Sequence, residues 1–127
     1  LRTKITVAAG AFILALVGAL CLSCKSDVTA DEVEAWIAAE APVGSDAAKV
    51  LAFLDARRIE HSELFESTNI DSVFPELGEA KKRLITAAIR DARRDLLVVR
   101  WDICVWFRFD DAGRLVESRV REIGTGL

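Results

Sequence analysis

One histidine, the serine beside it and a distant cysteine come nearest to a catalytic set in this 127-residue sequence. A Ser62 hydroxyl or Cys104 thiol becomes a nucleophile when a neighbouring base takes its proton, and His61 is the one histidine that could do so. His61 lies between Glu60 and Glu63, in an acidic stretch typical of a solvated surface loop. The sequence therefore predicts no catalytic residues and no enzyme. A hydrolase that uses His61 is a third hypothesis, which His61→Ala tests.

Metal-ligating residues are equally sparse. His61 and Glu63 supply two ligands, whereas a structural zinc ion takes four. Asp110 and Asp111 follow a predicted strand, but the oxygen ligands at alternating positions that a calcium loop requires are missing around them. We interpret both aspartates as turn residues, and the sequence predicts no metal, no other cofactor and no small-molecule substrate.

Positive charge is concentrated in one part of an otherwise acidic chain. One interpretation is a solvated face or a sheet edge that its charges keep from aggregating. The other is a basic patch that contacts anionic lipid headgroups or an acidic partner protein. The residues of this predicted patch are Lys81, Lys82, Arg83, Arg90, Arg93 and Arg94.

A long apolar segment lies near the amino end. Residues 5–24 contain no charged side chain and follow Arg2 and Lys4. A helix of this length would span roughly 30 Å, the hydrocarbon thickness of a bilayer. We therefore expect a signal peptide or a membrane anchor over residues 1–24, which places the rest of the chain outside the cytoplasm.

Two cysteines end this segment, and their setting resembles the processing site of bacterial lipoproteins, which are cut before a cysteine that then carries lipid. Ser23 suits the position next to such a cut, so Cys24 is the predicted lipid attachment residue, although Cys21 and Leu22 depart from the usual residues. Cys21, which follows Leu20, is the second candidate. Ordinary cleavage and an uncleaved anchor remain open. The expected location is the cell envelope, on the periplasmic side of a bacterial membrane.

Residues 25–127 have the length of one small domain with a single core. Within it, residues 25–44 hold a first helix and a connection, and residues 45–127 form the remainder. Without Arg2 and Lys4 this part has 15 basic and 20 acidic residues, a formal net charge of −5, which argues against a nucleic-acid partner.

Two short amphipathic helices are predicted at the start of this domain. Thr29 and Glu32 form a capping box for the first, with Trp36 in its apolar stripe, and Ser45 is the predicted cap of the second. The second has Ala47, Val50, Leu51 and Leu54 at helical spacing. Residues 58–78 are predicted to be irregular but packed against the domain, because a solvated linker has little use for two phenylalanines.

An antiparallel sheet should complete the domain. Residues 79–94 fit either a helix or a strand. Residues 97–109 are apolar at every second position, which predicts a strand with one buried face, and a turn at residues 110–113 leads into a further strand. Keeping the apolar faces of the two strands on the same side sets their register. Phe107 is then predicted to lie opposite Val116, and Val105 opposite Ser118. Asp102 is predicted to lie opposite Arg121 and to form an ion pair with it on the solvent-exposed face.

This order of elements, with its hairpin Phe-Asp-Asp-Ala-Gly-Arg-Leu at residues 109–115, resembles the small bacterial envelope lipoproteins of the SmpA/OmlA type. The resemblance covers residues 43–123. It implies an α+β fold, two helices packed on a three-stranded antiparallel β-meander, and a non-catalytic protein that binds other proteins; a similar fold recurs in secreted inhibitors of β-lactamase. It also favours a strand at residues 84–89. The longer stretch between helices and sheet, and the lack of a Gly-x-Pro after the second helix, depart from that family.

The strand face opposite the core is the second candidate surface. Its apolar residues, with a tryptophan among them, predict an interface with a partner, because tryptophan is enriched at such sites. The alternative is that residues 58–78 cover this face. The predicted interface residues are Val98, Cys104, Trp106 and Leu115. The sequence thus predicts an envelope lipoprotein that acts as a binding or scaffold protein, tethered to the membrane by its amino-terminal segment or a lipid and contacting another envelope protein. An inhibitor or immunity-type protein that blocks a specific enzyme is the alternative.

Overall fold

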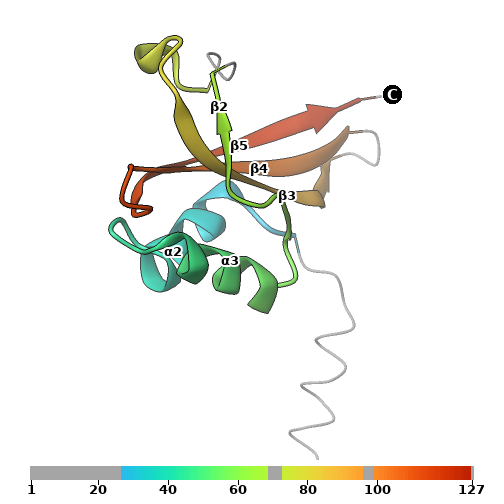
Figure 1. Cartoon of the computed structure of the whole chain (residues 1–127). Helices are drawn as coiled ribbons and strands as arrows, with labels where there is room; N and C mark the ends of the chain where they lie inside the picture. Colours follow the sequence, from blue (N-terminus) through green and yellow to red (C-terminus); the bar gives the residue numbers. More distant parts are fainter. Residues whose placement is uncertain (1–26, 69–72, 96–98, 127) are drawn as a thin grey trace, which may run out of the picture.

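The computed structural model describes residues 27–68, 73–95 and 99–126, in which two helices pack against one face of an antiparallel sheet (Figure 1). The predicted α+β class and helix pair are confirmed. The elements in chain order are α2 (Ala30–Glu40), α3 (Ala47–Ala56), β1 (Glu60–His61), β2 (Phe65–Ser67), the 3-10 helix η1 (Pro75–Leu77), β3 (Lys82–Asp95), β4 (Val99–Phe109) and β5 (Leu115–Thr125). The predicted signal or anchor, with Cys21 and Cys24, lies outside the described residues.

The sheet has five strands, so the prediction of three was wrong in number. β3, β4 and β5 form the predicted meander, while β1 and β2 both pair with the other edge of β3. These two strands have only two and three residues, too few to show the alternation that identifies a strand in a sequence. β3 confirms the strand reading of residues 84–89, because pairing with β4 overrides the helix propensity of its alanines.

Capping decides where each helix starts. The Thr29 hydroxyl accepts a hydrogen bond from the Glu32 amide at 3.3 Å, as predicted for α2. For α3 the predicted cap was one residue early: the Asp46 carboxylate accepts from the Lys49 amide at 2.7 Å. Ser45 is buried instead, and its carbonyl accepts a hydrogen bond from the Leu115 amide.

The β4–β5 register differs from the prediction by two residues. Phe107 lies opposite Ser118 and Val105 opposite Val120, so Ser118 and Val120 keep their predicted face although each pair is shifted. The connection is longer than the four-residue turn that the prediction assumed. Asp110 accepts hydrogen bonds from two amides of this turn, and a bulge follows where β5 begins.

The predicted placement of Asp102 opposite Arg121 was also wrong. Asp102 lies opposite Ile123 and is buried. Its carboxylate accepts a hydrogen bond of 2.7 Å from the Asp91 amide, at the point where β3 leaves its regular pairing with β4. Asp102 therefore satisfies the backbone of a strand irregularity, and its ion pair is with Arg100, whose Nε atom lies 3.5 Å from Asp102 Oδ1.

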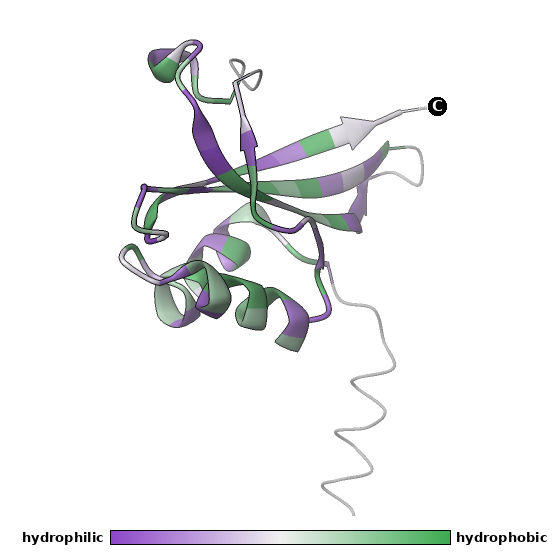
Figure 2. Ribbon diagram, in the orientation of Figure 1, coloured by the Kyte–Doolittle hydropathy of each residue, from purple (hydrophilic) through white to green (hydrophobic). Residues whose placement is uncertain are grey.

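Two hydrophobic clusters occupy the two faces of the sheet. The larger lies between helices and sheet, and Val33, Val50, Leu54, Ile103 and Phe107 are among its fully buried members. The smaller lies on the opposite face and comprises Val73, Phe74 and Leu84, with Phe65, Leu77 and Trp106 packed against it. Figure 2 shows hydrophobic residues on both helices and on the three long strands, as a sheet with apolar contacts on both faces requires.

Candidate functional site

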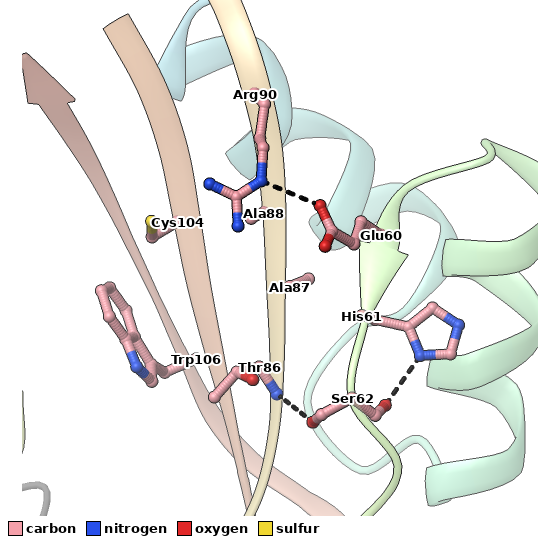
Figure 3. Close-up of a pocket in the computed structure, with 9 residues that line it drawn as sticks. All are labelled: Glu60, His61, Ser62, Thr86, Ala87, Ala88, Arg90, Cys104 and Trp106. Atoms are coloured by element: carbon pink, nitrogen blue, oxygen red, sulfur yellow. Dashed lines mark hydrogen bonds and ion pairs between the residues drawn. The ribbon is translucent and has the colours of Figure 1, made fainter. Parts of the chain in front are cut away.

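The sheet face opposite the helices contains a hollow of about 390 Å³. Ile103, Val105 and Phe107 of β4 point into the main core, so their neighbours Cys104 and Trp106 point to the other face. Thr86 and Ala88 of β3 lie opposite Trp106 and Cys104 and share that face. Figure 3 shows these side chains around the hollow, which is lined by Glu60, His61, Ser62, Thr86, Ala87, Ala88, Arg90, Cys104 and Trp106.

One end of this face is closed by residues 73–77. The Phe74 side chain is buried in the smaller cluster, and Trp106 packs against that cluster. Arg119 of β5 holds the segment in place: its guanidinium donates hydrogen bonds to the Val73 carbonyl and the Glu76 carboxylate and lies 4.5 Å from the centre of the Phe74 ring. The expected packing of residues 58–78 against the domain is therefore observed at this end, while the hollow stays uncovered.

The four predicted interface residues have different positions. Cys104 and Trp106 are half-buried and line the hollow. Leu115 was wrongly placed, because it is 2% exposed in the main core. Leu115 pairs with Phe109, whose side chain belongs to that core, and the bulge after it prevented a correct assignment from alternation alone. Val98 lies outside the described residues.

The predicted nucleophile and base are not brought into a catalytic arrangement. The His61 Nε2 atom lies 2.6 Å from Asp55 Oδ1, and its Nδ1 atom lies 2.7 Å from the Ser62 carbonyl oxygen. Both partners are acceptors, so the ring makes both bonds only by donating from both nitrogens, as the imidazolium ion. The Ser62 carbonyl first, and then Asp55, raise the pKa of His61. A ring in this state has no lone pair with which to act as a base.

Neither the Cys104 thiol nor the Ser62 hydroxyl is set up as a nucleophile. Cys104 is a free cysteine, and burial, followed by the nearby Asp102 charge, raises the pKa of its thiol, which disfavours the reactive thiolate. The Ser62 hydroxyl accepts a hydrogen bond of 3.0 Å from the Thr86 amide. It thereby helps to join the loop after β1 to β3. Over residues 27–68, 73–95 and 99–126, no group of three or more potential ligands is placed to hold a metal ion.

The predicted basic patch is divided among several separate contacts along β3. Lys82 is not a surface charge: its side chain is buried, and its Nζ atom donates to the carbonyls of Gly78, at 2.6 Å, and Ala80, at 3.1 Å. The other five cations each form an ion pair. These are Lys81 and Arg83 with Glu66, Arg90 with Glu60, Arg93 with Glu122, and Arg94 with Asp91.

The rim of the hollow combines one of these ion pairs with small residues. The Arg90 Nε atom lies 3.0 Å from Glu60 Oε2, across the β1–β3 pair. Ala88 leaves space beside Cys104 and Trp106, which creates the hollow. Sequence reasoning missed Glu60 and Ala88 as site residues. The available signal was that Thr86, Ala88 and Arg90 alternate along a strand, but it required the pairing partner to be known.

Comparison of the chain with protein-family models, with curated proteins and with solved structures gave no match. In the described part of the chain, no helix has the length and apolar character needed to cross a membrane.

Proposed function

We propose that this protein is a bacterial envelope lipoprotein that acts without catalysis as a binding or scaffold protein. Its partner is another envelope protein, bound at the hollow on the sheet face opposite the helices. The observation that carries the proposal is that this face is closed at one end by residues 73–77 and left open beside Trp106.

The composition of the hollow suits a protein partner. Its floor is formed by half-buried Ala88, Cys104 and Trp106, and its rim carries Arg90 and Glu60. Protein interfaces are enriched in tryptophan and arginine and surround an apolar centre with polar groups. The Arg90–Glu60 pair is solvent-exposed, so a partner can interact with either charge without leaving a buried ion unpaired.

The contacts of the polar side chains support a role without catalysis. His61 is engaged at both ring nitrogens, and its partner Asp55 belongs to α3. The half-buried Cys104 thiol has a raised pKa. These groups favour recognition over proton transfer.

The envelope location rests on the amino-terminal segment. Residues 5–24 are uncharged and apolar and end at Cys24, the proposed lipid attachment residue. The order of the elements, which resembles that of SmpA/OmlA-type lipoproteins, supports the same class. Mass spectrometry of the protein purified from its native membrane tests this address, because a diacylglycerol on Cys24 adds a mass that ordinary cleavage does not. An unmodified full-length chain recovered from the cytoplasm would overturn it.

Replacing each of two alanines by glutamine tests whether the partner binds at the hollow. Ala88→Gln fills it without removing a charge or an existing side-chain contact, and Ala52→Gln adds the same group at an exposed position on α3, in the other layer. A partner captured by the tagged full chain from native membranes, and then purified, should bind wild type and Ala52→Gln alike and Ala88→Gln at least about tenfold more weakly. Equal binding by all three proteins, at equal melting temperatures, would refute the site.

Trp106→Ala is a second test of partner binding at the same face. Because Trp106 also packs on the smaller cluster, we expect its loss to lower the melting temperature as well as the affinity for the partner. A captured partner that is an enzyme, and that loses activity when bound, would instead identify the protein as an inhibitor.

A further inference from the structure

Val28 fixes the amino end of the described chain to the domain, beside the carboxyl end of α3. The Val28 amide donates a hydrogen bond of 2.9 Å to the Ala92 carbonyl of β3, and the Val28 side chain packs against the main core. Cys24, the proposed lipid attachment residue, precedes Val28 by four residues, and we call this segment the tether. Four residues of extended chain span at most about 14 Å. In the proposed lipoprotein, as with an uncleaved anchor that ends at residue 24, the surface around Val28 is therefore held close to the bilayer.

A groove of about 340 Å³ opens at this point, between the helices and the β1–β3 pair. Its apolar walls are four half-buried side chains that pack against the main core: Val28, Trp36, Ile59 and Ile89. Val28 is thus both a wall of the groove and the residue at which the tether reaches the domain. Tryptophan is enriched where proteins meet the headgroup region of a bilayer, because its ring is apolar and its N–H group is polar. The walls therefore have the composition of a surface that contacts a bilayer.

Charged groups of both signs adjoin the groove. They are the cations Arg57, Arg58 and Arg90 and the carboxylates Asp27, Glu32, Glu40 and Glu60. Arg57 bonds Glu40 and lies over the Trp36 ring, 4.2 Å from its centre, and Arg90 pairs with Glu60. Arg58 is exposed and forms no ion pair with any residue in the described part of the chain. The two signs nearly balance, so contact with a bilayer here depends on the apolar walls and on Arg58, not on a net positive charge.

We propose that this groove is the surface by which the domain contacts the phospholipid bilayer that holds its tether. Trp36 lies at the level of the headgroups, and the Arg58 guanidinium binds a lipid phosphate through two parallel hydrogen bonds. The short tether raises the effective concentration of lipid at the groove, so a contact of low intrinsic affinity is sufficient. This inference rests on the membrane tether of the proposed function and adds the orientation of the domain to it.

This contact is compatible with a protein partner in the hollow. The linings of the groove and the hollow share Glu60, Ala88 and Arg90. Trp36 packs with the main core on the helix side of the sheet, whereas Trp106 packs with the smaller cluster on the opposite face. The bilayer and the partner therefore approach different faces of the sheet, and the shared rim places the partner close to the membrane surface.

Paramagnetic relaxation of backbone amides tests this orientation. The full chain, uniformly labelled with ¹⁵N, is reconstituted into phosphatidylcholine nanodiscs that contain a trace of lipid with gadolinium chelated at its headgroup. The amides of residues 57–59 report on the groove, and those of residues 122–125 at the end of β5 are the internal reference. Glu122 accepts a hydrogen bond of 3.0 Å from the Ala30 amide, so the reference also lies near the tether, but β5 and β1 are at opposite edges of the sheet. A domain that swings freely on its tether therefore exposes both segments to the label.

We expect the relaxation enhancement to be several-fold larger at residues 57–59 than at residues 122–125. Arg58→Glu should reduce this ratio at least about twofold, because a carboxylate replaces the group that binds the phosphate. Lys49→Glu makes the same charge change at an exposed position near the other end of α3, outside the groove, and should leave the ratio unchanged. Unchanged amide shifts of Ile103, Val105 and Phe107 in both variants show that the main core is intact.

Two results would overturn the inference and leave the tether in place. One is a relaxation enhancement at residues 122–125 that equals or exceeds the value at residues 57–59. The other is an equal ratio for wild type, Arg58→Glu and Lys49→Glu, because the contact between Arg58 and phosphate would then be absent. A protein that does not stay with the nanodiscs, and shows no enhancement at any described amide, would instead overturn the membrane tether of the proposed function and the inference with it.

Discussion

Arg58 adopts a backbone conformation that favours glycine. It follows the carboxyl end of α3 with a φ of 56°, in the left-handed region. The Arg58 amide donates to the Asp55 carbonyl at 3.0 Å, and the Ile59 amide donates to the Leu54 carbonyl at 2.9 Å. These two bonds define the Schellman motif, in which the residue at the position of Arg58 is usually glycine. Arg58→Gly should therefore relieve strain without changing the fold.

The expected gain is the difference between two effects. A residue with a Cβ atom pays roughly 1–2 kcal/mol in the left-handed region, which glycine avoids. Glycine loses more backbone entropy on folding, which offsets roughly 0.5–1 kcal/mol of the stability gained by relieving this strain. The exposed Arg58 side chain contributes little to packing. Arg58→Gly should thus raise the free energy of unfolding by about 0.5–1 kcal/mol, and the melting temperature by about 2–8 °C for a domain of this size.

Thermal and urea denaturation of the full chain, followed by circular dichroism, measures this gain. Arg58→Ala is the matched control, since alanine loses the guanidinium but keeps the Cβ atom and hence the strain. It should be no more stable than wild type. An unchanged or lower stability of Arg58→Gly, or an equal gain for Arg58→Ala, would refute the reasoning.

Two further predictions concern pH. His61 stabilises the fold as an imidazolium ion bonded to Asp55, and its pKa is raised above the ordinary value of 6.5. This stabilisation is therefore complete below pH 6.5 and is lost as the pH rises through the raised pKa. Between about pH 6 and about pH 9 the free energy of unfolding should therefore fall more for wild type than for His61→Gln, and parallel pH profiles would contradict the assignment. The Glu122 carboxylate accepts hydrogen bonds from the Ala30 amide and from Arg93, and these two bonds, the first more strongly, lower its pKa below the ordinary 4.5. The stabilisation by Glu122 is therefore present above pH 4.5 and is lost as the pH falls through the lowered pKa. Glu122→Gln should reduce stability by about 0.5–1 kcal/mol at neutral pH, with the difference shrinking in acid, and equal chemical denaturation curves at pH 7 would exclude this role.

Local patterns were sufficient to predict β4 and α2. β4 was predicted from the alternation over residues 97–109, and α2 from the Thr29 cap and its apolar spacing. Both signals arise within a few neighbouring residues, so the sequence alone contains them. The candidate site was partly accessible in the same way, because the position of Trp106 in β4 determines that its side chain points away from the residues of the main core.

The remainder of the site depends on residues that are distant in sequence. Glu60 reaches the hollow because β1 pairs with β3, a pairing that two residues cannot signal on their own. Phe74 covers one end of the face because Arg119, 45 positions later in the chain, holds its segment. Lys82 looked like part of a basic patch, yet the carbonyls of Gly78 and Ala80 enclose its ammonium group.

Periodicity and capping are local properties, so the sequence by itself determined the class of the fold, the two helices and the face of the sheet on which each β4 side chain lies. Pairing across the chain is a competition among registers, and only the tertiary structure decided it: the five-residue turn and bulge moved β5 by two positions, and β1 and β2 formed on β3. The hollow results from these pairings, because residues of β1, β3 and β4 line it. The energies of these pairings come from contacts between distant segments, which no window of neighbouring residues contains.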